Sequence, residues 1–151
     1  KEQPNSYLML VGEGELKTSI QDKVRTLGLE DYVIFTGLRS DVNELLQAMD
    51  VFLFPSLYEG LPVSIIEAQA AGLPCLISDK VPIECKKTDL VYQLSLEDSF
   101  NTWADKIYEL SHITRRDTYE EIKKSGFDIV ENAKWLENFY IELYKKALGE
   151  E

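Results

Sequence analysis

Short apolar runs, rich in branched and aromatic residues, alternate along this chain with stretches of helical periodicity. The runs at residues 7–11, 32–36, 51–54, 75–78 and 90–93 predict five strands. Continuous apolar strands separated by helices are typical of a parallel sheet with helices on both faces. No linker, internal repeat or low-complexity tract interrupts the pattern. The alternation therefore predicts a single α/β domain.

The helical stretches are expected at residues 16–27, 41–49, 63–71, 100–110 and 115–124. Glycines at positions 28 and 72 end the first and third of these helices. A long last helix places four apolar side chains on one stripe, namely Trp135, Phe139, Leu143 and Ala147. The sheet is therefore expected to be followed by a helical C-terminal tail.

The charge of the chain argues against several classes of partner. Sixteen basic and 27 acidic residues give a net charge of -11, which repels nucleic acid and anionic lipid. No apolar run is long enough to span a bilayer, and the first residues do not resemble a secretory signal. Of the two cysteines, Cys75 is expected to be buried and Cys85 to lie at the surface, with neither a disulfide nor a metal site. These features fit the reducing cytoplasm.

Ligands of parallel α/β sheets bind at the carboxyl ends of the strands. The loops at that edge are residues 12–15, 37–41, 55–62 and 79–87. The third loop runs from a strand into a helix, and its Gly60 removes side-chain bulk just before the helix. Free N–H groups and the positive end of the helix dipole favour an anion there.

Two glutamates accompany this predicted anion site. Glu67 lies among apolar helical residues with no Lys or Arg within four positions, and a buried carboxylate needs hydrogen-bond donors. A ribose diol would supply two donors. The alternative is that Glu67 faces solvent along a polar seam with Ser64. Glu59 lies in the loop, close to where a sugar beyond a diphosphate would lie.

Glu59 and Glu67 are separated by seven residues, and the segments 54–56 and 68–74 flank them. This pattern resembles the E-x7-E signature of retaining GT-B glycosyltransferases, including bacterial capsule, exopolysaccharide and lipopolysaccharide enzymes. The resemblance extends over residues 7–84 and is weaker in the terminal helices. It implies the Rossmann-like C-terminal half of a GT-B fold, with strand order 3-2-1-4-5-6 and the first βα unit missing.

The resemblance also implies a role for each site residue. Glu67 would bind the ribose, and Glu59 would act as the catalytic residue that contacts hydroxyls of the donor sugar. The remaining donor-binding positions would be Gly60, Leu61, Pro62 and Val63 at the diphosphate or sugar, Gly37, Leu38 and Arg39 at the base, and Gly12 and Gly14 along the interdomain cleft. The family uses no metal, and no cofactor is expected.

The expected function is donor binding within a retaining hexosyltransferase that builds a cell-surface polysaccharide or glycan. The donor would be a UDP- or GDP-sugar, and a sugar or lipid-linked acceptor would bind through the missing N-terminal domain. The family's Arg and Lys that neutralise the leaving diphosphate precede residue 7, where this chain offers only Lys1. The 151 residues are therefore expected to be inactive alone and to self-associate through the unpaired strands. The full-length enzyme would be cytoplasmic, at the inner face of the membrane.

Three other functions fit an α/β domain of this kind. One is a nucleotide-sugar epimerase of the related two-domain type, and another is a Rossmann-like module that binds NAD or FAD. The third is a structural adaptor. A dinucleotide site needs G-x-G-x-x-G after the first strand, and here Lys17 stands at the position of the third glycine.

Overall fold

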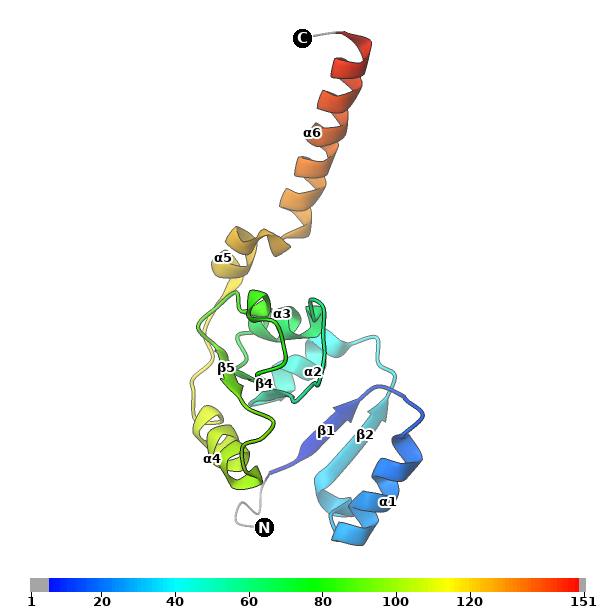
Figure 1. Cartoon of the computed structure of the whole chain (residues 1–151), viewed down its shortest axis with the longest axis vertical. Helices are drawn as coiled ribbons and strands as arrows, with labels where there is room; N and C mark the ends of the chain where they lie inside the picture. Colours follow the sequence, from blue (N-terminus) through cyan, green and yellow to red (C-terminus); the bar gives the residue numbers. More distant parts are fainter. Residues whose placement is uncertain (1–5, 150–151) are drawn as a thin grey trace. The chain divides into compact units, whose positions relative to one another are not determined.

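The computed structural model describes residues 6–149, which divide into two compact units. The first unit ends at Val42 and the second begins at Asn43. Each unit contains its own parallel sheet (Figure 1). The units are described separately below.

The sheet of the first unit has two parallel strands, β1 (Leu8–Val11) and β2 (Val33–Gly37). The connection between them consists of helix α1 (Lys17–Leu27) and the short helix η1 (Glu30–Tyr32). As predicted, α1 ends at Gly28, where a φ of 64° places the backbone in the left-handed region that glycine favours. None of the α1 side chains is buried.

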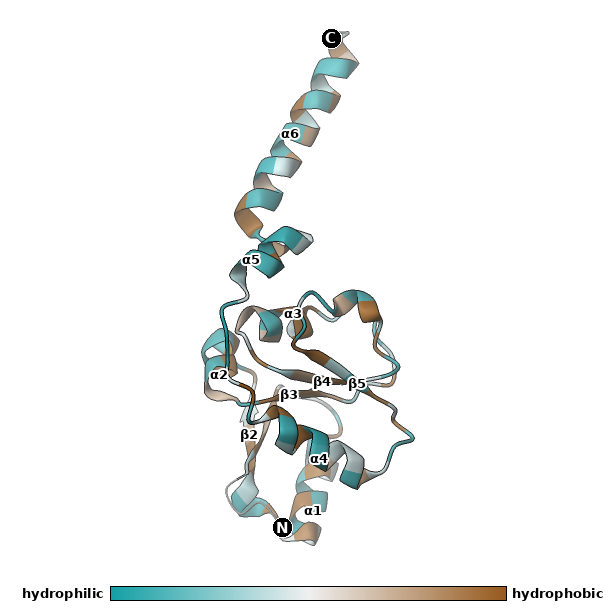
Figure 2. Ribbon diagram, turned by 90° about the vertical axis from the view of Figure 1, so that its left-hand side faces the viewer, coloured by the Kyte–Doolittle hydropathy of each residue, from teal (hydrophilic) through white to brown (hydrophobic). Residues whose placement is uncertain are grey.

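The sheet of the second unit contains β3 (Phe52–Phe54), β4 (Cys75–Ser78) and β5 (Val91–Leu94), all parallel and in that order. Every residue of the middle strand β4 is buried, and β3 and β4 are hydrophobic along their length (Figure 2). The neighbours within each sheet match the predicted order.

Three helices of the second unit accompany its sheet. These are α2 (Val42–Ala48), α3 (Val63–Ala70) and α4 (Phe100–Leu110), of which α3 and α4 lie on opposite faces of the sheet (Figure 2). The buried apolar side chains of the unit come from the strands, the helices and the loops between them: Leu46, Ile65, Ile66, Ala68, Leu73, Cys75, Leu76, Ile77, Val81, Cys85, Leu90, Val91, Leu110 and Ile122. This arrangement confirms the α/β fold class.

The helix predicted at residues 115–124 is wrong in its first part. Helix α5 covers only Tyr119–Ile122 and continues into the wide turn η3 (Lys123–Phe127). Arg115 is drawn out of a helix by tertiary contacts, because its guanidinium donates to the carbonyls of Leu46, at 2.8 Å, and of Met49 at the carboxyl end of α2. Cations are favoured at that end of a helix.

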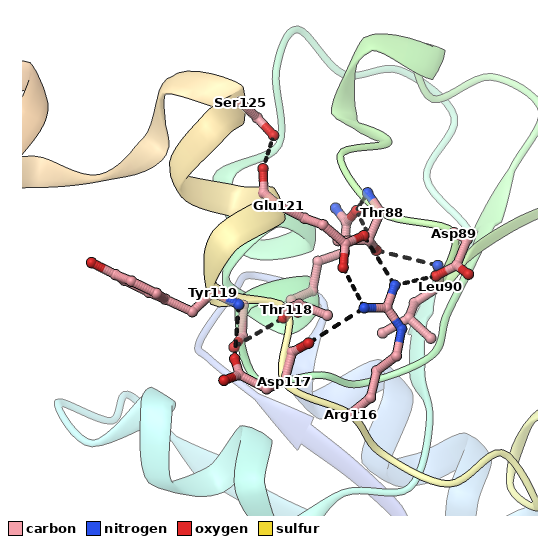
Figure 3. Close-up of polar contacts among 11 residues, drawn as sticks. Thr88, Asp89, Leu90, Arg116, Asp117, Thr118, Tyr119, Glu121 and Ser125 are labelled. Atoms are coloured by element: carbon pink, nitrogen blue, oxygen red, sulfur yellow. Dashed lines mark hydrogen bonds and ion pairs between the residues drawn. The ribbon is translucent and has the colours of Figure 1, made fainter.

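After Arg115, the side chains of Arg116 and Thr118 also bind the rest of the unit (Figure 3). Arg116 forms ion pairs with Asp89 and Glu121 (Figure 3). The buried hydroxyl of Thr118 donates to the carbonyl of Gln69 in α3, at 2.6 Å. These contacts tie the segment in front of α5 to the rest of the unit.

The predicted terminal helix is present as α6 (Ile129–Leu148), which begins at Asp128 with a side-chain cap to the amide of Glu131. None of its side chains is buried. Trp135 and Phe139 stack with ring centroids 5.4 Å apart, and both are exposed. The predicted apolar stripe therefore exists but does not contribute to the core of the described unit.

The prediction that Cys85 lies at the surface is wrong. Cys85 belongs to the short helix η2 (Ile83–Cys85) and is fully buried, as is Cys75, and both thiols are free. The loop is drawn inward because Gln69 of α3 donates to the carbonyl of Cys85, at 2.8 Å. Burial raises the pKa of the Cys75 thiol to about 12 and raises that of Cys85 as well.

Candidate functional site

The loop between β3 and α3 lies at the carboxyl end of the β3–β4–β5 sheet, where ligands of such sheets bind. Pro62 precedes the first turn of α3, and no side chain caps this end of the helix. A Cβ atom added at Gly60 would meet nothing within 4 Å. Leu61 and Val63 are exposed. The start of α3 therefore offers open space and main-chain amides to an anion.

Glu59 is held within this loop by a neighbouring serine. The hydroxyl of Ser56 donates to Oε1 of Glu59 at 2.8 Å. Glu59 is half-buried, whereas Tyr58 beside it is exposed. The carboxylate is therefore fixed at one oxygen, while Oε2 has no hydrogen bond to any residue from 6 to 149.

Glu67 is exposed, so the expectation that it is buried among apolar residues is wrong. The helical period explains this, because the buried face of α3 consists of Ile65, Ile66, Ala68 and Gln69, and Glu67 falls outside it. Its carboxylate forms no hydrogen bond or ion pair within the described chain. It lines a groove of about 270 Å³ between α2 and α3, together with Asn43, Leu46, Gln47, Ala70 and Ala71.

Three residues that support this region were not singled out from the sequence. Ser56 is one, although its position three residues before a glutamate is a spacing at which a hydroxyl and a carboxylate can meet in a turn. Ser78 at the end of β4 is fully buried and donates to the carbonyl of Ser56. Gln69 is fully buried on the apolar face of α3. Its polar side chain between apolar neighbours was the available signal, since buried amides need partners.

In the first unit, the predicted loops that follow β1 and β2 begin side by side. The amide of Gly12 donates to the carbonyl of Gly37 at 2.9 Å, which joins the ends of β1 and β2. The backbone of Gly12 has a φ of 129°, and that of Gly37 a φ of 69°. Gly14, by contrast, has neither a positive φ nor any atom within 4 Å of an added Cβ. Gly12 and Gly37 are thus required by the local turn geometry.

Leu38 and Arg39 follow β2 in this unit. Leu38 is 80% exposed. Arg39 pairs with Asp41, with Nε at 2.7 Å from Oδ1. This hydrogen bond holds the pKa of the Asp41 carboxyl below its usual value.

Residues 6–149 contain no group of three or more His, Cys, Asp or Glu side chains that could hold a metal ion. In the same part of the chain, none of the helices combines the length and the apolar character needed to cross a membrane.

Two curated proteins resemble most of this chain. The putative glycosyltransferase EpsF of Bacillus subtilis is 39% identical over 140 residues, covering 88% of this chain and 36% of EpsF. The Escherichia coli UDP-Gal:alpha-D-GlcNAc-diphosphoundecaprenol alpha-1,3-galactosyltransferase is 31% identical, covering 93% of this chain and 38% of that protein. The chain thus spans well under half the length of either relative.

The fold is also similar to solved structures. Anabaena Alr3699/HepE, crystallised with UDP and glucose, has a TM-score of 0.73 at 20% identity, over 91% of this chain and 41% of that protein. This likeness agrees with the Rossmann-like α/β architecture described above. The family model described as "Glycosyl transferases group 1" matches residues 1–112. With this match and the resemblance to EpsF, the chain belongs to the group 1 glycosyltransferase family.

Proposed function

We propose that this chain binds the nucleoside diphosphate sugar donor of a retaining glycosyltransferase. The observation that carries the proposal is the position of the two glutamates. Glu59 lies in the loop that leads into the uncapped start of α3, and Glu67 lies on the exposed side of the same helix. A diphosphate at the start of α3 would then have one carboxylate near each of its two substituents.

In this proposal the main-chain N–H groups of Gly60, Leu61 and Val63 bind the diphosphate or the first sugar atoms, while Pro62 between them has no N–H to donate. Glu67 accepts hydrogen bonds from the ribose diol, and Glu59 accepts one from a hydroxyl of the donor sugar. Both carboxylates have oxygens without a hydrogen-bond partner in the described protein. Hydrogen bonds to charged acceptors are among the stronger ones, so these two residues would contribute much of the selectivity for a sugar nucleotide.

The loops of the first unit receive separate roles. The exposed Leu38 and the backbone of Gly37 and Arg39 contact the base, and Gly12 and Gly14 border the space used by a second domain. We propose uridine as the base because the named Escherichia coli relative uses UDP-Gal and the HepE structure contains UDP.

The biological setting is also a proposal. A relative that acts on a diphosphoundecaprenol-linked sugar supports a hexosyltransferase of cell-surface glycan synthesis, acting on a lipid-linked or sugar acceptor at the cytoplasmic face of a membrane. This chain matches only 36–38% of its relatives' length. Acceptor binding and the cations that stabilise the leaving diphosphate are therefore assigned to parts outside it, and this chain alone is expected not to catalyse transfer.

Isothermal titration calorimetry of the chain with UDP, GDP, UDP-glucose, UDP-galactose, GDP-mannose and NAD tests the proposal. We expect UDP and at least one UDP-sugar to bind, and NAD not to bind. Saturable binding of NAD alone would favour the dinucleotide-binding alternative. If none of the nucleotides binds at millimolar concentration, the proposal is wrong.

A further inference from the structure

Two successive hydrogen bonds connect the centre of the second unit's sheet to the carboxylate of Glu59. The first begins at Ser78, the last residue of β4, whose hydroxyl donates to the main-chain carbonyl of Ser56. The second begins at the Ser56 hydroxyl, which donates to Oε1 of Glu59 at 2.8 Å. The loop carboxylate is thereby linked to the most buried strand of the molecule.

Ser78, at the buried end of these two hydrogen bonds, is held in place by the sheet. Strand β4 is flanked on both sides by parallel strands, and its Ile77 lies opposite Phe54, the last residue of β3. Ser78 is fully buried, and its oxygen also accepts from the amide of Lys80 at 3.3 Å. Its hydroxyl therefore has a fixed place from which it can hold the Ser56 peptide as the chain leaves β3.

Glu59, at the exposed end of these two hydrogen bonds, has few other restraints. Leu57 and Tyr58, between the serine and the glutamate, are 80% and 86% exposed. Apart from the Glu59 bond, the Ser56 hydroxyl contacts, among residues 6–149, only the carbonyl of Tyr58, at 3.2 Å. No described residue other than Ser56 binds the Glu59 carboxylate. Without Ser56 this side chain would populate several rotamers, and a ligand would have to order it.

We infer that Ser56 and Ser78 are positioning residues that fix Glu59 with Oε2 available to a hydroxyl of the donor sugar. Ser56 sets the orientation of the carboxylate, and Ser78 sets the orientation of the Ser56 peptide. Neither serine needs to touch the donor. This inference rests on the proposed function, because it assumes that Glu59 contacts the sugar.

The test is a comparison of UDP with UDP-galactose and UDP-glucose, titrated into the full chain by calorimetry. We expect Ser56→Ala to leave UDP affinity unchanged and to reduce the advantage of the UDP-sugar over UDP by roughly three- to tenfold, the range of one hydrogen bond. Ser56→Thr, which keeps the hydroxyl, should restore the advantage. Ser111→Ala serves as the control, because this exposed serine bonds only within its own helix end.

A double variant distinguishes positioning from a general effect on folding. If Ser56 acts through Glu59, Ser56→Ala should have no further effect when Glu59→Ala is already present. Additive losses in the double variant would overturn the inference, as would a UDP-sugar advantage that Ser56→Ala leaves intact while Glu59→Ala abolishes it. If neither Ser56→Ala nor Glu59→Ala reduces the advantage of the UDP-sugar while UDP still binds, the role of Glu59 in the proposed function is refuted instead.

Ser78 is tested with Ser78→Ala and Ser78→Thr, each checked first by thermal unfolding. We expect Ser78→Ala to lower the UDP-sugar advantage in the same direction as Ser56→Ala and Ser78→Thr to lower it less. If Ser78→Ala does not fold, the comparison of Ser78→Thr with the parent replaces it. An unchanged advantage in a folded Ser78→Ala protein would remove Ser78 from the positioning role.

Discussion

Glu67 lies one helical turn after Val63, and both side chains are on the exposed side of α3. A ligand bound at the first turn of the helix would therefore extend toward Glu67 rather than toward the core. We expect Glu67→Gln to weaken UDP binding by roughly 1.5–3 kcal/mol, the scale of hydrogen bonds to charged groups.

Calorimetry with UDP measures this loss, and thermal unfolding should show almost no change because the side chain is exposed. The matched control is Glu97→Gln, which alters a charge in the loop after β5. Equal UDP affinity in parent and Glu67→Gln would mean that Glu67 does not bind ribose.

Glu59→Ala should affect the binding of the donor sugar and leave the binding of the nucleotide unchanged. If Glu59 contacts only the sugar, UDP should bind as it does to the parent, and the extra affinity of a UDP-sugar should be lost. Titrations with UDP and UDP-galactose measure both quantities on one sample. Equal losses for the two ligands would place Glu59 at the diphosphate instead.

The strands and the ends of most helices follow from the sequence because each depends on local physics. The apolar run at β4 and Gly28 after α1 are examples. The part that could not be predicted depends on tertiary contacts. Arg115 leaves the helical pattern to bind carbonyls some 66 residues away, and Cys85 is drawn inward by Gln69. For the site, the pattern of Glu59 and Glu67 was visible, and the exposure of Glu67 was stated only as the alternative to its burial.

Gly72→Ala should be among the most destabilising small substitutions. The residue has a φ of 68°, and an added Cβ would lie 2.3 Å from the carbonyl oxygen of Arg116. Backbone strain alone costs about 1–3 kcal/mol, and the clash adds to it. Urea unfolding measures the difference, with Gly14→Ala as a control at a position with open space. A loss in Gly72→Ala no greater than in the control would contradict the geometry.

The two thiols should be unreactive while the protein is folded. Burial raises the pKa of Cys75 to about 12 and that of Cys85 above its ordinary value, so little thiolate exists at pH 8. With a thiol-reactive dye at pH 8, we expect both cysteines to react slowly in buffer and rapidly in denaturant. Fast labelling of Cys85 without denaturant would show that its loop opens readily.

The chain should self-associate, and α6 provides a way to identify the surface. Trp135→Glu with Phe139→Glu removes the exposed aromatic stack, whereas Ala133→Glu with Asn138→Glu adds the same two negative charges to α6 without removing an aromatic ring. Light scattering should show smaller particles for the double variant if α6 carries the contact. Unchanged association would point to the unpaired edges of β1 and β3. A parent chain that is monomeric at high concentration would refute self-association altogether.

The side-chain amide of Gln69 determines which parts of the second unit unfold together. Its Nε2 donates to the carbonyls of Ile65 and Cys85, and its Oε1 accepts from the amides of Lys87 and Thr88. Opening the loop after β4 would leave Oε1 without its two donors and Nε2 with the carbonyl of Ile65 alone, which is costly for a buried amide. The loop and the helix that carries Glu67 therefore form one cooperative unit, and subglobal unfolding should release both together.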